Sequence, residues 1–383
     1  MGPLLGQELK AHSRAADPLE MERVGENVSF FAALAVVALI TGVIAVWLAV
    51  GVGGQMATLY ADDLGTVAAV VAATILCLRA GLRLEGPMRR FWWLLAAACG
   101  AWALGEVIWA VYDLILHQDV PVPSWADIGY LTAIPLAVAA LLFHPALHGR
   151  GVRVARGIFD GLVIATALLF LSWTLVLGPL WHETDLTTAG GVVALAYPFG
   201  DAVILFFIVL VVRALPKGEN LALWCLLAGL LALALADSSY AYLTEVKNYG
   251  AGDILDVGWI VGYLGIALGA FCADRPSVVP RTNASVPSLT AFVAPFMPIL
   301  VALIFISVEI ELGHRPDQVA LIVAFALVVL VLARQALLLA DMVSQHGAPG
   351  SNRLERLRAT VLASMPEAPS AEPSPRPKAS GVE

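Results

Sequence analysis

Four pairs of side chains in this chain have types and a spacing that could support chemistry. Each pair is an acid followed three residues later by an aromatic ring: Glu106 and Trp109, Asp127 and Tyr130, Asp237 and Tyr240, Asp256 and Trp259. Residues three apart lie on one face of an α-helix, so each carboxyl group has a ring on its own face. The surroundings are apolar, where a carboxylate is costly and therefore requires a structural or functional reason.

The pairs belong to a segment that occurs twice. Much of the pattern of residues 105–130 returns about 130 residues later, first around Asp237 and then around Asp256. Ala-Asp-Ser-Ser-Tyr corresponds to Gly-Glu-Val-Ile-Trp, and Asp-Val-Gly-Trp corresponds to Asp-Ile-Gly-Tyr. The repetition predicts two parallel copies of a helical hairpin, with a looser third copy between them.

Composition predicts the elements that position these residues. Of the 383 residues, 60% are hydrophobic and 14% are charged, whereas a soluble domain carries roughly 25% charged residues. We therefore expect an all-α fold, a polytopic membrane helix bundle whose main partner is the lipid bilayer. The net charge of −8 is segregated by loop, and no basic patch indicates a nucleic-acid partner.

Ten apolar runs each come near the roughly 20 residues that a membrane-spanning helix needs. They predict a membrane domain over residues 29–345, preceded by a cytoplasmic leader over 1–28. A short amphipathic cytoplasmic segment over 346–365 and a disordered tail rich in Pro, Ser and Ala over 366–383 are expected to follow. The predicted spans are residues 29–52, 64–82, 91–116, 126–147, 154–181, 188–212, 220–243, 254–272, 289–308 and 319–339.

The loops predict the orientation of the bundle. Of the 22 Lys and Arg residues, all but Lys247 and Arg315 fall in the terminal segments or in loops on the same side. The positive-inside bias places that side, and both termini, in the cytoplasm. The opposite loops are acidic, and this interpretation assigns Asp62 and Asp63 to the first of them.

The acids inside the predicted spans are concentrated toward the outer face. At a rise of ~1.5 Å per residue, Glu106 lies ~22 Å up a ~30 Å hydrocarbon core. Asp113, Asp127, Asp237 and Asp256 are predicted near or above that level, Asp201 near the middle, and Asp160 alone in the inner third. No Lys or Arg is predicted at the depth of the outer acids. The candidate ligand-binding site consists of Glu106, Trp109, Asp127, Tyr130, Asp201, Asp237, Tyr240, Asp256 and Trp259.

Three roles for these acids remain open from the sequence. They could hydrogen-bond between helices and so hold the bundle together, form a ligand or cation pocket open to the outside, or belong to a proton pathway. Pro198 and Gly200, next to Asp201, indicate either an ordinary helix kink or a broken helix of the kind found at transporter sites. A secondary transporter or channel for a cation or small solute is therefore an alternative function, and a structural scaffold is another.

Other chemistry has little support. The seven histidines are scattered, and the four cysteines lie in apolar spans without a Cys-x-x-Cys pair, so haem or metal ligation by these residues has little support and no cofactor is expected. Whether the acids bind a metal ion is left open. The chain has no Gly-x-Ser-x-Gly elbow, P-loop or His-Glu-x-x-His motif. We therefore do not expect an enzyme.

Six short motifs resemble those of a known membrane region. They are Glu106-x-x-Trp-x-x-Tyr, Pro123-Ser-Trp-Ala-Asp-x-x-Tyr-Leu, Phe159-Asp-Gly-Leu, Tyr197-Pro-x-Gly-Asp, Ala236-Asp-x-x-Tyr and Asp256-x-x-Trp-x-x-Gly-Tyr-Leu. Their order and spacing are similar to the N-terminal multi-helix region of bacterial diguanylate cyclases and phosphodiesterases, the proteins with GGDEF and EAL domains. The resemblance covers roughly residues 30–345 and implies a sensory input module in a bacterial inner membrane.

The chain departs from that family after the last span. Residues 339–345 are similar to the start of a helical linker, but no Gly-Gly-Asp-Glu-Phe or Glu-Ala-Leu signature of a catalytic domain follows. We therefore expect a membrane sensory or ligand-binding module without its own output domain. Its signal would pass through the last helix to a cytoplasmic signalling partner or to a second copy in a homodimer.

Overall fold

The computed structural model describes residues 18–148, 152–183, 187–214, 221–245, 250, 252–273, 297–311, 313 and 317–347. Within these ranges every regular element is a helix and none is a strand, which confirms the predicted all-α class. The chain divides into two compact units, Met1–Arg334 and Gln335–Glu383, and all packing described below lies within the first. The α-helices are α2 (Pro18–Val50), α3 (Gln55–Arg83), α4 (Gly86–Ala110), α5 (Ala126–Phe143), α6 (Val152–Ser172), α7 (Gly178–Glu183), α8 (Ala189–Ala214), α9 (Leu221–Glu245), α10 (Val257–Phe271), α12 (Met297–Glu311) and α13 (Gln318–Gly347).

Eight helices in the described ranges are long and apolar enough to cross a membrane, so the chain is a multi-pass membrane protein by length and composition. Two of the ten predicted spans correspond to shorter helices: α6 contributes an apolar stretch over Gly157–Ser172, and α12 has 15 residues. Helix α2 begins at Pro18, within the predicted leader. The predicted amphipathic segment and tail lie outside the described residues from position 348 onward.

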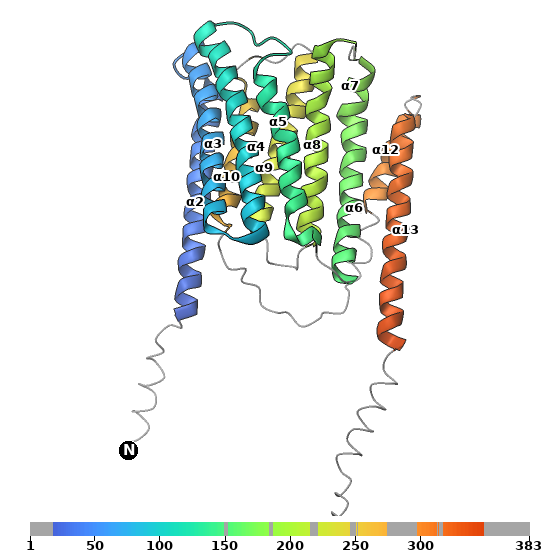
Figure 1. The fold of residues 1–383 in the computed structure, drawn as a ribbon. Helices are drawn as coiled ribbons and strands as arrows, with labels where there is room; N and C mark the ends of the chain where they lie inside the picture. Colours follow the sequence, from blue (N-terminus) through green and yellow to red (C-terminus); the bar gives the residue numbers. More distant parts are fainter. Residues whose placement is uncertain are drawn as a thin grey trace, which may run out of the picture. The chain divides into compact units, whose positions relative to one another are not determined.

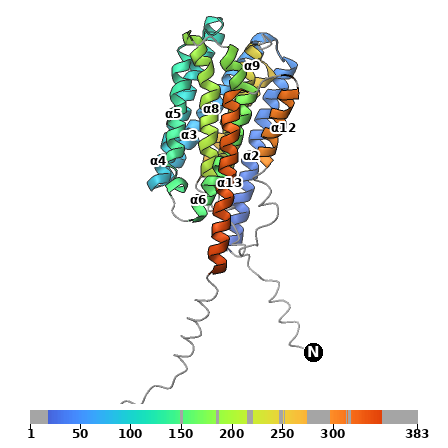
Figure 2. The ribbon, with the colours of Figure 1, turned by 90° about the vertical axis from the view of Figure 1, so that its right-hand side faces the viewer.

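Helices α3, α4, α5, α8, α9 and α10 run side by side and share one buried core (Figures 1 and 2). The two hairpins that carry the repeated pattern, α4 with α5 and α9 with α10, are packed closely through glycine. A Cβ atom on Gly129 would lie 2.6 Å from the carbonyl oxygen of Ala101, and one on Gly265 would lie 2.7 Å from the Cα of Gly229. Only glycine permits such an approach of two helix backbones, so the sequence repeat has a counterpart in the packing.

A second apolar cluster joins α6, α12 and the first part of α13. It contains Val163 and Phe170 of α6, Ala302 of α12, and Leu327 and Val331 of α13. All five side chains are almost fully buried, although none of them belongs to the larger core. The unit from Met1 to Arg334 therefore has two apolar cores, and the acid–aromatic pairs belong to the helices of the larger one.

Irregular turns occur where the sequence did not predict them. Helix α8 continues through Pro198 as one helix from Ala189 to Ala214, as expected of a kink rather than of a broken helix. Two short π-helices are found instead, at Val111–Leu116 after α4 and at Trp173–Leu177 after α6. The first begins at Val111, two residues after Trp109 of the candidate site.

Candidate functional site

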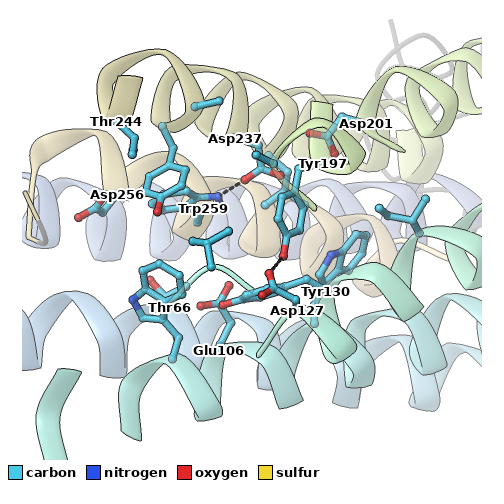
Figure 3. A pocket seen from close by; sticks show the side chains of 18 of the residues that line it. Thr66, Glu106, Asp127, Tyr130, Tyr197, Asp201, Asp237, Thr244, Asp256 and Trp259 are labelled. Carbon is cyan, nitrogen blue, oxygen red and sulfur yellow. Dashed lines mark hydrogen bonds between the residues drawn. The ribbon is translucent and has the colours of Figure 1, made fainter. Parts of the chain in front are cut away.

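A cavity of about 510 Å³ lies between α3, α4, α5, α8, α9 and α10, at the end of the bundle where α3 and α5 begin. Its volume is within the roughly 300–1,000 Å³ that is usual for small-molecule sites. All nine residues predicted from the sequence line it, and Figure 3 shows Glu106, Asp127 and Tyr130 on one side of it and Asp237 and Trp259 on the other. The structure thus brings together acids from two hairpins and from α8 that lie up to 150 positions apart, between Glu106 and Asp256.

The cavity also contains residues that sequence reasoning missed or misplaced. Asp62 and Asp63 were assigned to a loop before a span at residue 64, and this assignment is wrong because α3 begins at Gln55. Both acids are therefore helical and buried, with exposed fractions of 7% and 8%. Tyr197 and Tyr263 also line the cavity. Each is four residues from a predicted site residue on its helix, a spacing that could have revealed it.

In both repeated hairpins an aromatic side chain on the second helix lies beside an acid on the first. The ring of Tyr130 on α5 lies beside Glu106 of α4, and the indole Nε1 of Trp259 on α10 donates to Oδ1 of Asp237 on α9 over 2.6 Å. The acid of each repeat therefore has an aromatic neighbour across the hairpin as well as the ring three residues along its own helix. This arrangement explains why the two halves of the pattern occur together in the sequence.

The acids at the start of the second helices have a different role. Asp127 accepts hydrogen bonds from the backbone N–H of Ser124 and from the hydroxyl of Tyr197 on α8. Asp256 accepts from the backbone N–H of Gly252 over 2.9 Å. Each carboxyl group thus fixes the loop that leads into its helix. These two acids are structural as well as cavity-lining.

One further bond joins the two hairpins. The hydroxyl of Tyr263 on α10 donates to Oε1 of Glu106 on α4 over 2.8 Å. The rings of Trp109, Tyr240 and Trp259 meet edge to face, with centroids 6.3 Å apart for the first two and 5.9 Å for the last two. Together these three rings form a continuous aromatic wall of the cavity.

Carboxyl groups also meet one another. Asp201 is in hydrogen-bond contact with Asp237, and Asp62 is in the same kind of contact with Asp256. Two ionised carboxylates repel, so each contact requires a shared proton or a cation. The described residues that line the cavity comprise seven carboxyl groups and no Lys, Arg or His. Among the described residues, none supplies a fixed positive side chain to neutralise this cavity.

Two carboxylate oxygens have no hydrogen-bond donor in the described part of the chain. They are Oδ2 of Asp63 and Oδ2 of Asp201, and both are inaccessible to solvent. A buried acceptor without a donor is costly and rare in a native structure. Asp113, another predicted outer acid, differs because it accepts the indole N–H of Trp109 over 3.2 Å.

The cavity does not have the arrangement of a metal centre. Within the described ranges, no three His, Cys, Asp or Glu side chains are grouped so that they could hold a metal ion. A scan against protein-family models, a search of curated proteins and a search of solved structures each found no match. The fold and the site therefore define only a class, a multi-pass membrane helix bundle with an acidic and aromatic cavity between its hairpins.

Proposed function

We propose that this chain is an integral membrane sensory or ligand-binding module of a bacterial inner membrane. In this proposal ten helices span the bilayer, both termini are cytoplasmic, and the cavity opens to the outside. The distribution of Lys and Arg among the loops supports the orientation. The resemblance of the six motifs to the input region of GGDEF and EAL proteins supports a sensory role.

One observation carries the proposal, namely the convergence of polar side chains from six helices on a single cavity. Its described lining includes seven carboxyl groups and seven aromatic rings. A purely structural role would leave each acid bonded to its own neighbour and would require no shared space. The cavity and the two acceptors without donors, on Asp63 and Asp201, favour binding over a scaffold.

A secondary transporter is the second candidate, and one feature of α8 favours it. Pro198 deprives the carbonyl of Ala194 of its helical donor, and Ala194 lines the cavity. Free carbonyls near a midplane acid are used for ion coordination in transporters. Against a pathway, Asp160 is bonded to two arginines and is not part of the cavity lining.

In the sensory proposal the ligand changes the packing of the hairpins, because its contacts come from both of them. Tyr263 connects α10 to Glu106 of α4, so an occupant of the cavity touches the bond that joins the two repeats. The change would reach a cytoplasmic partner, or a second copy of the chain, through α13. A ligand can shift such an equilibrium only by its difference in affinity for the two arrangements.

The test uses the full-length protein in lipid nanodiscs and panels of inorganic cations, amines, amino acids, sugars and organic acids. At least one panel should raise the thermal unfolding midpoint of the wild type. The effect should disappear in the double variant Glu106→Gln, Asp237→Asn, whose amide oxygens still accept from Tyr263 and Trp259. The exposed Asp119→Asn substitution removes one charge outside the cavity and serves as the matched control.

The outcomes separate the candidates. A response that survives in the double variant, or no response to any panel, would discard the site. Uptake of the stabilising solute into liposomes that contain the purified protein would identify a transporter and overturn the sensory proposal. Binding without uptake is the result expected of a sensor.

A further inference from the structure

We infer that the cavity binds an organic ammonium ion, a small amine with an apolar body, and not an anion, a neutral solute or a bare metal ion. The inference rests on the proposed function, because it names the class of ligand for that site. It follows from the charge of the lining, from acceptors that lack donors, and from the position of the aromatic wall.

The charge of the side chains that line the cavity determines the sign of the net charge of the ligand. In the part of the chain that the structure describes, the cavity is lined by seven carboxyl groups without a basic side chain. Whichever of these groups are ionised, their charge is negative, and they repel an anion. A cation restores the balance that Lys or Arg would otherwise provide.

Two acceptors point to a ligand that donates hydrogen bonds. Asp63 is 8% exposed and lines the cavity, yet its Oδ2 receives no hydrogen bond from any described residue. Oδ2 of Asp201, on another helix, also receives no hydrogen bond from any described residue. Neither oxygen is accessible to solvent in this structure, so a ligand reaches it only when the carboxyl group turns toward the cavity. An ammonium group, with up to three N–H donors and no acceptor, complements a carboxyl oxygen that turns in this way.

The two contacts between carboxyl groups are further sites for an ammonium group. In Figure 3, Asp201 and Asp237 lie together on one side of the cavity, and Asp256 lies beyond Trp259. A cation that donates to both members of a carboxyl pair replaces the proton that they otherwise share. The cavity thus contains two such pairs, with an aromatic surface between them.

The aromatic wall indicates that the ligand is organic. Trp109, Tyr240 and Trp259 form a continuous ring surface against which a cation with an apolar body can pack. A small inorganic cation would instead need a compact shell of oxygen ligands. No such group of acids is present among the described residues, and about 510 Å³ is far more space than one ion fills.

The probes are butylammonium, 1,4-diaminobutane and tetramethylammonium, compared with 1-butanol, butyrate, and sodium and magnesium chloride at matched ionic strength. Binding to the full-length protein in nanodiscs is followed by thermal unfolding and by tryptophan fluorescence, since three tryptophans line the cavity. We expect the ammonium probes to raise the unfolding midpoint and to alter the fluorescence. The alcohol, the carboxylate and the salts should do neither.

Two substitutions test the two kinds of contact, the hydrogen bond to a carboxyl group and the packing against an aromatic ring. Asp63→Asn should weaken butylammonium binding about tenfold, because it removes a charged acceptor, while Asp119→Asn should leave binding unchanged. Tyr240→Leu should weaken tetramethylammonium more than butylammonium, since a quaternary ion has no N–H and depends on the rings. The two substitutions are independent, so the inference stays testable if one variant fails to fold.

The results distinguish this inference from the function on which it rests. If butyrate, butanol or a metal salt binds and the ammonium probes do not, the ligand class is wrong and the binding module stands. If none of the probes and none of the solute panels binds, both fail. If ammonium probes bind and accumulate in liposomes, the ligand class stands and the sensory proposal is overturned.

Discussion

The acids of the cavity and Asp160 of α6 show two ways in which one residue type is accommodated in an apolar bundle. Asp160 accepts from Nη2 of Arg213 over 3.1 Å and from Nε of Arg334 over 2.7 Å. The cavity acids are bonded instead to phenols, indoles, backbone N–H groups and one another. At Asp160 the chain supplies its own cations, whereas none of the described residues that line the cavity is basic.

The Asp160 ion pair and the cavity acids differ in structural role as well as in the residues around them. Arg334 of α13 is 4% exposed, so its ion pair with Asp160 fastens α13 to α6 beside the second apolar core. Such a pair leaves no room for a ligand. In the cavity, rings and carboxyl groups surround open space, which is the arrangement expected of a site that exchanges its occupant.

The largest effect is expected from Asp160→Asn. The substitution takes an anionic partner from Arg334, a buried charge that has little access to solvent. The free energy of unfolding should fall by about 3 kcal/mol, near the lower end of the range for buried pairs because Asp160 is partly exposed. Chemical unfolding in mixed micelles measures it, with Asp119→Asn as control. A loss below about 1 kcal/mol would show that the pair behaves like a surface ion pair.

A buried histidine outside both regions makes the stability of the fold depend on pH. His144, which follows α5, is buried against Phe91, and its Nδ1 accepts the N–H of Ala146. Burial lowers its pKa to about 4 from the ordinary 6.5. The unfolded chain therefore takes up the proton first as the pH falls. The contribution of neutral His144 to the free energy of unfolding is fully present above pH 6.5. It declines as the pH falls from 6.5 to about 4, and it does not change further below pH 4.

The measurement is unfolding of wild type and His144→Gln between pH 4 and pH 7. The wild type should lose about 2 kcal/mol more than the variant over this interval, since each pH unit between the two pKa values is worth about 1.4 kcal/mol before the structure relaxes. His148→Gln, an exposed neighbour, should follow the wild type. Equal pH profiles for wild type and His144→Gln would contradict the assignment.

The cavity depends on how closely α4 and α5 approach, and Gly129→Ala disturbs this directly. The new Cβ would lie 2.6 Å from the carbonyl oxygen of Ala101 and from the backbone nitrogen of Gly105. These are backbone atoms, so the helices must separate, at a cost of about 1.5 kcal/mol. Thermal unfolding should show the loss. Gly42→Ala, which meets nothing within 4 Å, is the control, and equal midpoints for the two would rule out tight packing at Gly129.

The smallest effect, and one opposite in sign to that of Asp160→Asn, is expected from Asp201→Asn. This substitution removes a carboxyl group from a pair that has no basic partner and lets an amide donate to Asp237. The free energy of unfolding should stay the same or rise by about 1 kcal/mol in the absence of ligand. Destabilisation as large as that of Asp160→Asn would mean that the cavity acids are held as firmly as the ion pair.

Much of the site was predictable because its signals are local. The spacing of three between acid and ring, and its return about 130 residues later, identified eight residues, and the position of Asp201 within an apolar span identified a ninth; all nine line one cavity. The start of α3 was not predictable, because Asp62 and Asp63 resemble loop residues until their partners are known. Hydropathy places the start of the span after Asp62 and Asp63, because a charged pair ends an apolar run. The helix instead begins earlier, at Gln55, because both acids are buried against neighbouring helices.

The sequence by itself determined the helical class, the apolar spans and the faces on which the acids lie, because periodicity and composition act over a few residues. Only the tertiary structure decided which partner each acid received. Asp160 is bonded to an arginine 174 residues away, and Glu106 to a tyrosine 157 residues away. Such pairings depend on which helices are neighbours and how closely their glycines let them approach, and no local pattern encodes that.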